Sequence, residues 1–480
     1  MIIINNLLTD LLPIFCLFGT IIAIMLSISW SRNHFLHFSL SILGLVCSLI
    51  SLFFIHFYIP IEINFLFKID DYAVLYSAFI LVLTIFICII SYFSLDHYYD
   101  VKDEFYLLIL LSSLGCLLLT MTVHMISLFI GLELVSLPLI GLLGYFKNRH
   151  QVLESTLKYM ILSGLTSTFL LFGIALVYIG SGGLSFIELQ IALNMNSMNH
   201  LILLFGIGMI LIVLFFKLSL FPFHLWVPDV YQGTSALTLT FFSTVVKTAI
   251  FVVLVRLFLY LPVEKVFSIY FICSIVAICS ILFGNLMALF QINLKRLLAY
   301  SSISHFGYLL IILVTLQSNS YFLETVGMYL FGYCLSNLGL FTIINYFSDL
   351  NNKHDLDSAI LYKGLFWRNP ILCFFMTSMI FSLSGIPLGL GFISKFFLFY
   401  SIMNSNFWFL WFIVVLGTVI GLYYYLRISI NLYLPSNNVT YLNYINNSNV
   451  FIVLLGIINI IFGLFPAILI DLIRSSTLFL

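Results

Sequence analysis

Long apolar segments alternate with short polar connections along the whole chain. A helix that crosses a membrane needs about 20 apolar residues, and fourteen segments come close to that length. Their expected ranges are 7–30, 35–57, 73–95, 104–122, 124–146, 156–180, 199–228, 236–260, 266–290, 297–317, 324–347, 370–400, 406–432 and 449–474. Since lipid cannot satisfy exposed backbone groups, such segments must be helical. The pattern therefore predicts an all-α integral membrane protein with about 14 transmembrane helices and no soluble domain.

Two of these segments, the seventh and the twelfth, are interrupted. Proline cannot donate a hydrogen bond to the residue four positions earlier, so Pro222 frees the carbonyl of Leu218. Pro387 frees the carbonyl of Leu383 in the same way. Irregular backbone at membrane depth is tolerated only inside protein or beside water. We therefore expect helices 7 and 12 to be broken, each beside a cavity.

The two breaks lie at matching places in two blocks of five helices, segments 4–8 and 9–13. Paired interrupted segments are typical of transport proteins built from structural repeats. Because five is an odd number, consecutive blocks must run in opposite directions, and the repeat is expected to be inverted. The expected domains are residues 1–100 with helices 1–3, 101–262 with the first repeat, 263–432 with the second repeat, and 433–480 with helix 14.

Composition excludes several classes of protein. The chain has 480 residues, of which 63% are hydrophobic and 8% are charged, against roughly 25% charged residues in soluble domains. The net charge is zero and basic residues are not clustered, which argues against a nucleic-acid partner. The eight cysteines are scattered without a C-x-x-C pair, so neither a zinc site nor an iron–sulfur cluster is indicated.

Lysine and arginine residues indicate the orientation, because they are more frequent in cytoplasmic loops. Loops after segments 1, 3, 5, 9, 11 and 13 carry ten basic residues, against four on the opposite side. The first group is Arg32, Lys102, Lys147, Arg149, Lys295, Arg296, Lys353, Lys363, Arg368 and Arg427, and the second is Lys68, Arg256, Lys265 and Arg474. This bias predicts that both termini face away from the cytoplasm or matrix.

The four other basic residues and one carboxylate fall in or against the apolar segments: Glu133, Lys158, Lys217, Lys247 and Lys395. A charge at the bilayer centre costs at least ~2.5–3.5 kcal/mol and marks an ion or proton pathway by default. We expect Glu133 to form an ion pair with Lys217, whose charged form would be favoured by the carboxylate and disfavoured by burial. In this interpretation Lys247 is the central relay and Lys395 lies nearest the exit.

Three of the candidates have plain alternatives. Lys158 has Glu154 four residues earlier and could be an interfacial anchor paired with it. His224 and His305 are possible relays, because imidazole titrates near neutral pH. A lone histidine in a membrane is more often an ordinary hydrogen-bonding residue, so both interpretations stay open for each.

Four stretches of the chain carry a resemblance to a known family. Lys217 to Tyr231 resembles the block F-K-x-x-x-x-P-F-H-x-W-x-P-D-V-Y, and Asn293 to Tyr308 is a further close match. Leu132-Glu133-Leu134 with Ser136-Leu137-Pro138 resembles a fifth-helix motif, and Leu157-Lys158-Tyr159 a sixth-helix motif. The chain thus resembles the antiporter-like membrane subunits of respiratory complex I. It departs from the family at Gln232-Gly233-Thr234-Ser235, where E-G-A-P is usual.

The resemblance implies a proton-translocating subunit of NADH:quinone oxidoreductase. It implies proton transfer through Glu133, Lys158, Lys217, Lys247 and Lys395. No cofactor is expected in this chain; NADH, FMN, iron–sulfur clusters and quinone are implied in the partner subunits of the membrane and peripheral arms. A bacterial inner membrane is expected, with the mitochondrial inner membrane as the alternative.

Two other functions are compatible with the same residues. One is a subunit of a multi-subunit sodium/proton antiporter, and the other is a passive assembly scaffold whose charges have no transport role. A redox enzyme of the haem–copper type is excluded by the lack of paired histidine ligands in the sequence.

Overall fold

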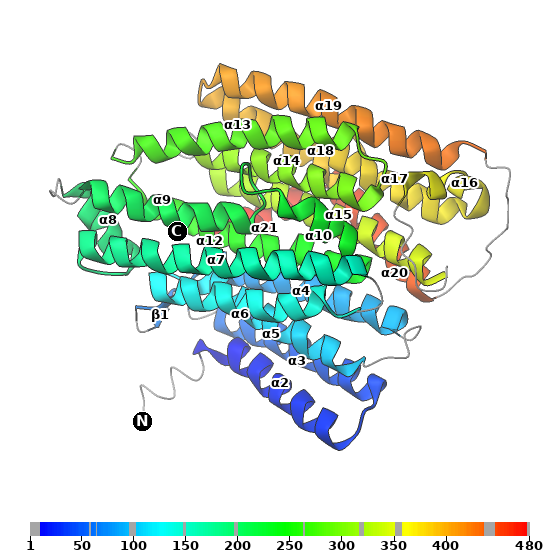
Figure 1. Cartoon of the computed structure of the whole chain (residues 1–480), viewed down its shortest axis with the longest axis horizontal. Helices are drawn as coiled ribbons and strands as arrows, with labels where there is room; N and C mark the ends of the chain where they lie inside the picture. Colours follow the sequence, from blue (N-terminus) through cyan, green and yellow to red (C-terminus); the bar gives the residue numbers. More distant parts are fainter. Residues whose placement is uncertain are drawn as a thin grey trace. The chain divides into compact units, whose positions relative to one another are not determined.

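Helices make up nearly all of the computed structural model of this chain (Figure 1). The structure describes residues 10–56, 59–63, 65–95, 102–146, 150–195, 200–262, 265–315, 321–350, 358–435 and 447–477. Within these ranges, 12 helices are long and apolar enough to cross a membrane. The prediction of an all-α integral membrane protein is therefore confirmed. Lys147, Arg149 and Lys353, which contribute to the predicted orientation, lie outside the described residues.

The remaining apolar segments are built from pairs of shorter helices. The twelfth consists of α17 (Pro370–Ser384) and α18 (Leu390–Asn404), so its predicted break is present. The fourteenth consists of α20 (Asn447–Leu464) and α21 (Ala467–Thr477), which meet at Pro466 with a bend of 82° that was not predicted. In the seventh segment, the regular helix ends at Lys217, as Pro222 predicts.

The chain divides into two compact units. The first contains Met1–Leu218, Val245–Phe271 and Ser475–Leu480. Its described elements are α2 (Leu12–Trp30), α3 (His34–Ile55), β1 (Ile61–Ile63), β2 (Phe67–Ile69), α4 (Asp71–Leu95), α5 (Asp103–Met121), α6 (Met125–Leu143), α7 (His150–Ser181), α8 (Phe186–Asn194), α9 (His200–Lys217) and α12 (Lys247–Tyr260). Here α7 packs against both α6 and α9, and α12 packs against α5 and α9.

The second unit contains Ser219–Thr244 and Ile272–Arg474. It holds α10 (Trp226–Gly233), α11 (Ala236–Phe241), α14 (Leu294–Val314), α15 (Phe322–Leu350), the 3-10 helix η4 (Ala359–Tyr362), α16 (Leu365–Arg368), α17, α18, α19 (Trp408–Tyr433), α20 and most of α13 (Phe267–Leu289) and α21. The helices α15, α17, α18 and α20 all pack against one another. The inverted relation of the two five-helix blocks, the domain bounds and the side on which the termini lie stay predictions.

Local hydrogen bonds explain where several elements begin. Ser185 and Glu188 form a reciprocal capping box at the start of α8, and these hydrogen bonds lower the pKa of the Glu188 carboxyl. His124 caps α6, since its Nδ1 accepts a hydrogen bond from the Ile126 amide at 3.2 Å. Burial lowers the pKa of His124, which favours the neutral ring that this cap requires.

Two basic residues that the sequence assigned to loops are buried. Arg256 lies within α12 and is 1% exposed, where its Nη2 contacts Oδ1 of Asp70 at 2.7 Å. Lys295 is the second residue of α14 and donates to the carbonyl of Thr234 at 3.0 Å. Lys295 was expected between two segments and lies inside α14, and Arg256 was counted with the loop charges although it falls in the expected segment 236–260. Counting charges near segment ends does not reveal a partner distant in sequence.

Asp70 connects three elements of the first unit through one carboxylate. It follows β2, which pairs antiparallel with β1, and its Oδ1 accepts from the Ala73 amide at 2.9 Å in the first turn of α4. The same oxygen accepts from Arg256, whose guanidinium lies 5.5 Å from the Tyr72 ring centre. Removing one partner of such a buried pair leaves an uncompensated charge, which is strongly destabilising.

Arg256→Met is therefore expected to lower the free energy of unfolding by about 3–5 kcal/mol. Asp70→Asn added to it removes the unpaired charge and keeps an oxygen for the Ala73 amide, so the double variant should recover most of the loss. Thermal unfolding of the detergent-solubilised protein measures both effects. A single variant as stable as the unsubstituted protein would contradict the assignment.

Candidate functional site

Lys217 is the last residue of α9, where the seventh apolar segment breaks. Its side chain is 5% exposed, and Nζ lies 5.6 Å from the centre of the Tyr159 ring. Among the described residues the ammonium has no hydrogen-bond partner. A cation over an aromatic ring gains about 0.5–2 kcal/mol, which is less than the cost of a charge at membrane depth. The charged form of Lys217 therefore depends on further, longer-range interactions.

Glu133 supplies such an interaction from α6. Its carboxylate interacts electrostatically with both Lys217 and Tyr159, and Ser136 donates to its Oε2 at 3.3 Å. The carboxylate is not within 4.0 Å of the Lys217 ammonium, so the direct ion pair expected from the sequence is not formed. The reason is structural: α7, which carries Tyr159, packs against both α6 and α9.

Lys158 precedes Tyr159 on α7 and has a different environment. Its ammonium contacts Oε1 of Glu154 at 2.7 Å, and the two side chains are 42% and 65% exposed. The helix begins at His150, six residues before the predicted start, because the apolar count left out the polar first turns. Lys158 therefore lies two turns inside α7 and makes the i, i+4 pair expected from its neighbour Glu154.

Lys247 is completely buried at the first residue of α12. The five residues before it, Phe242–Val246, form a π-helix inside the apolar stretch Ala236–Tyr260. Such turns are rare and are often found at functional sites. The hydroxyl of Ser243 in this turn is buried and makes no hydrogen bond to the described part of the chain. Lys247 thus follows a local widening of its helix that no sequence pattern indicated.

Lys395 lies on α18 in the second unit and is 7% exposed. Its Nζ donates at 2.8 Å to the carbonyl of Ser384, the last residue of α17. Its Nζ also lies 5.9 Å from the Tyr308 ring centre. The carbonyl end of a helix carries partial negative charge that favours a nearby cation. The break in the twelfth segment therefore provides the acceptor that its own lysine needs.

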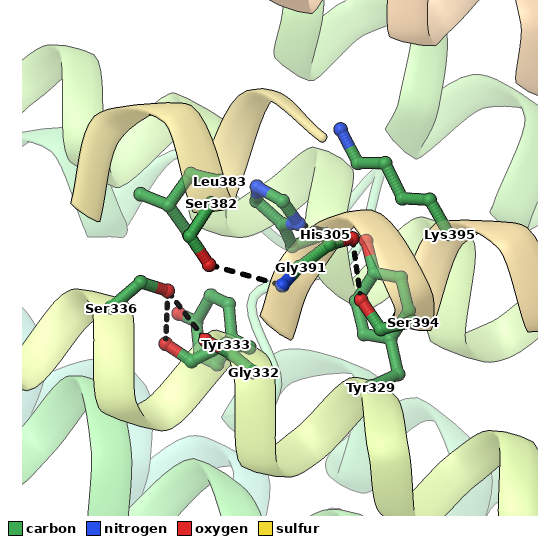
Figure 2. Close-up of a pocket in the computed structure, with 10 residues that line it drawn as sticks. All are labelled: His305, Tyr329, Gly332, Tyr333, Ser336, Ser382, Leu383, Gly391, Ser394 and Lys395. Atoms are coloured by element: carbon green, nitrogen blue, oxygen red, sulfur yellow. Dashed lines mark hydrogen bonds between the residues drawn. The ribbon is translucent and has the colours of Figure 1, made fainter. Parts of the chain in front are cut away.

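A small cavity of about 10 Å³ lies beside Lys395, which is close to the minimum that holds one water molecule. Figure 2 shows Ser382 and Leu383 of α17 opposite Gly332, Tyr333 and Ser336 of α15, with Lys395 extending past His305. The cavity has polar groups from four helices. A water-filled space beside the predicted break is thus sterically available.

His305 is buried on α14 and hydrogen bonded on both ring nitrogens. Nδ1 lies 2.8 Å from the Tyr329 hydroxyl and Nε2 lies 3.4 Å from that of Tyr425. It also interacts electrostatically with Lys395. The structure therefore brings His305 and Lys395 together at one cavity, which the sequence alone did not predict.

A second chain of hydrogen bonds begins at Tyr308, under the ammonium of Lys395. The Asn285 amide donates to the Tyr308 hydroxyl at 3.1 Å, and the Tyr424 hydroxyl donates to the Asn285 carbonyl oxygen at 3.2 Å. All three residues are buried. These three side chains extend the polar surroundings of Lys395 beyond the residues that line the cavity.

His224 has a different environment in the turns between α9 and α10. The ring is 2% exposed, with its centre 5.4 Å from that of Phe221 and 4.5 Å from that of Phe283. It lies in the second unit, and these two ring contacts are aromatic. Its suggested role as a relay stays a prediction.

Residues 122–421 match a family of membrane proteins described as NADH:quinone oxidoreductase/Mrp antiporter, TM. The chain belongs to this family. The match covers more than half of the 480 residues and includes Glu133, Lys158, Lys217, Lys247 and Lys395. With its many apolar helices, the protein is an integral, multi-pass membrane protein of the NADH:quinone oxidoreductase/Mrp antiporter type.

Solved structures share the fold over nearly the whole length. A chain of respiratory complex I from Thermus thermophilus with bound aureothin has 27% sequence identity and a TM-score of 0.81, covering 96% of this chain and 98% of that one. A chain of the membrane-bound sulfane sulfur reductase, an archaeal respiratory membrane complex, has 20% identity and a TM-score of 0.85, covering 98% and 96%. A chain of the Mrp complex from Dietzia sp. DQ12-45-1b has 16% identity and a TM-score of 0.84, covering 98% and 97%. The last two share the fold alone.

In this family member, sequence reasoning missed the polar partners of the lysines. Tyr159 stands next to Lys158, and its place between two charged groups follows only from helix packing. Asn285 and Asn459 are completely or almost completely buried in apolar helices, where an amide usually makes hydrogen bonds between helices. Their presence inside apolar segments was the signal available in the sequence.

A substitution at Gly385 tests whether this glycine makes room for the Lys395 side chain. Its φ is +85°, and a β-carbon there would lie 2.6 Å from Cδ of Lys395. Gly385→Ala should therefore cost about 1–2 kcal/mol of backbone strain and a further ~1.5–3 kcal/mol for the lost hydrogen bond to the Ser384 carbonyl. Structure determination should find the ammonium displaced from that carbonyl, and thermal unfolding should show the larger loss.

Gly182→Ala is the matched control for this substitution. Gly182 has a φ of +75° with open space where a β-carbon would be. Its alanine variant therefore has the same backbone strain but displaces no neighbouring side chain. Equal losses of stability in the two variants would show that Gly385 makes no room for Lys395.

Proposed function

We propose that this chain is the proton-translocating membrane subunit N, called subunit 2 in mitochondria, of an NADH:quinone oxidoreductase. The observation that carries the proposal is that Lys217 and Lys395 are buried where helices end inside apolar segments. Family membership and the 27% identity to a chain of a respiratory complex I support it. Lys395 favours subunit N over its sister subunit M, which resembles this chain but carries glutamate at that place.

The first proton-transfer step would occur at Glu133, Tyr159 and Lys217. Burial disfavours the ammonium and a nearby carboxylate favours it, so the distance from Glu133 sets the protonation of Lys217. The present separation, with no contact within 4.0 Å, leaves room for Glu133 to approach or withdraw. Approach would hold a proton on Lys217, and withdrawal would release it.

The magnitudes are compatible with work against a membrane potential. Bringing unit charges to about 4 Å is worth roughly 4 kcal/mol at an effective dielectric constant of about 20. Moving one charge against about 100 mV takes ~2.3 kcal/mol. The free energy released by one rearrangement of the Glu133 carboxylate would therefore be large enough to move one proton against this membrane potential.

Lys247 and Lys395 would be the next proton-transfer residues. Lys247 is buried in α12, which packs against the α9 helix that carries Lys217. Lys395 has the Ser384 carbonyl, His305 and a cavity of about 10 Å³ around it. Lys158, which is paired with the exposed Glu154, would exchange protons at the surface of the first unit rather than in its interior.

The energy input would come from partner subunits. In this proposal NADH, FMN, iron–sulfur clusters and quinone are bound by other chains of the membrane and peripheral arms, and this chain contributes proton transfer without a cofactor. Quinone chemistry would reach it as a displacement of charge at a neighbouring membrane subunit. The assembly would lie in a bacterial inner membrane.

Lys217→Ala in the assembled complex is the direct test. Proton pumping and quinone reductase activity should both fall by about 100-fold or more, because a positioned proton-transfer group contributes that much. Pumping is measured by the quenching of a pH-sensitive dye in membrane vesicles driven by NADH. Lys363→Ala is the control, since Lys363 is an exposed loop residue. Undiminished pumping in a normally assembled Lys217→Ala complex would refute the proposal.

Lys395→Glu tests which property of this residue matters. It keeps a titratable group and reverses the sign of its charge, as in the sister subunit. We expect partial pumping in Lys395→Glu, within about tenfold of the unsubstituted complex, and none in Lys395→Ala, because proton transfer requires a titratable group. Equal activity of the two variants, measured by the same vesicle assay, would contradict a proton-transfer role for Lys395.

A sodium/proton antiporter subunit is the second candidate, favoured by the fold shared with the Mrp complex. Such a subunit would exchange sodium for protons without NADH. Reconstituted vesicles that acidify in response to a sodium gradient, and not to NADH with quinone, would favour this candidate.

A further inference from the structure

One face of α20 packs unusually closely on the break in the twelfth segment. Gly456, Asn459 and Gly463 follow one another at three and four residues, so they share a face of the helix. A β-carbon at Gly456 would overlap the Phe375 ring of α17, and one at Gly463 would lie 2.8 Å from the backbone of Gly389. This close approach brings the completely buried Asn459 side chain to the break itself.

Asn459 supplies an acceptor to the start of α18. The first amides of a helix have no partner within the helix, and the N-cap residue Gly389 has no side chain to offer one. The Leu390 amide donates to Oδ1 of Asn459 at 3.4 Å. The Gly391 amide donates to the Ser382 hydroxyl at 3.1 Å, and that hydroxyl donates to the same Oδ1 at 3.3 Å. Figure 2 shows the bond between Ser382 and Gly391.

The two halves of the broken segment are therefore joined at two places. Ser382 of α17 contacts the first turn of α18, and Ser384 of α17 accepts from Lys395 one turn further along α18 at 2.8 Å. Both contacts require α18 to begin at a fixed position and angle. Asn459 belongs to neither half, and it binds the first turn of α18 and Ser382 at once.

We infer that Asn459 is a positioning residue for Lys395: its amide oxygen fixes the start of α18 so that the Lys395 ammonium reaches the carbonyl end of α17. Asn459 lies outside residues 122–421, the part of the chain that matches the family. The inference rests on the proposed function only for its effect on pumping. The position of the Lys395 ammonium does not depend on whether Lys395 transfers protons.

Asn459→Leu and Asn459→Asp separate the acceptor from the packing. Both side chains are close to asparagine in size, but only aspartate keeps an oxygen for the Leu390 amide and Ser382. Structure determination of the two variants in the assembled complex should find Lys395 displaced from the Ser384 carbonyl in Asn459→Leu and retained in Asn459→Asp. An ammonium that stays on the carbonyl in Asn459→Leu, or leaves it in both variants, would overturn the inference.

Proton pumping per quinone reduced supplies the functional measurement. A misplacement of about 1 Å can cost up to about 100-fold, so Asn459→Leu should pump at least about tenfold less, while Asn459→Asp restores pumping. A displaced Lys395 with unchanged pumping would support the positioning role and refute the proposed proton transfer through Lys395. Equal losses of pumping in Asn459→Leu and Asn459→Asp would refute the role of the Asn459 oxygen as an acceptor.

Ser382→Ala provides a second route if Asn459→Leu does not assemble. It removes one oxygen, and with it the bond to the Gly391 amide, so the same displacement of Lys395 is expected. Ser378→Ala is the matched control, because Ser378 lies one turn earlier on α17 and its hydroxyl, as far as the chain is described, bonds only the Phe375 carbonyl of its own helix. Lys395 displaced equally by both alanines, or by neither, would contradict the inference.

Discussion

A helix that ends inside an apolar segment has carbonyl groups that lipid cannot satisfy, and this constraint underlies the arrangement of the buried charges. Lys217 is the last residue of α9, and Lys395 donates to the last carbonyl of α17. A cation at a helix carboxyl end gains about 0.3–2 kcal/mol. At the twelfth-segment break an unsatisfied acceptor and a costly cation thus offset each other, whereas at the seventh the cation lies at the carboxyl end of its helix without such a bond to the described residues.

The two lysines differ in how firmly they are held. Lys395 has a hydrogen bond of 2.8 Å to Ser384 and an aromatic ring nearby. Lys217 has an aromatic ring and a carboxylate at longer range, and none of the described residues accepts a hydrogen bond from it. A group without a fixed acceptor responds most to a distant charge, whereas a bonded group holds its position. If the proposed function holds, this difference would suit Lys217 to respond to a displaced charge and Lys395 to keep a fixed position.

The sequence was sufficient for the helices and for the breaks in the seventh and twelfth segments, but not for the bend between α20 and α21 or the π-helix before Lys247. Backbone exposed to lipid must be helical, so the length of an apolar run predicts a helix, and Pro222 and Pro387 predict its interruption, although Pro138 lies inside α6 without ending it. The partners of the charges could not be predicted in the same way. Arg256 was counted with the loop charges because its partner Asp70, 186 positions away, could not be foreseen. Glu133 was expected to contact Lys217 because the packing of α7 against α6 and α9 is not visible in the sequence.

The same distances along the chain determine when each charge finds its partner during synthesis. The acceptor of Lys395 precedes it by 11 residues in the same apolar segment, so ammonium and carbonyl enter the bilayer together. Arg256 follows Asp70 by 186 residues, so its partner has already been synthesised when the arginine emerges from the ribosome. In both cases the acceptor is made first and the cation second. The nascent protein therefore never has to keep these two cations in lipid while it waits for later segments.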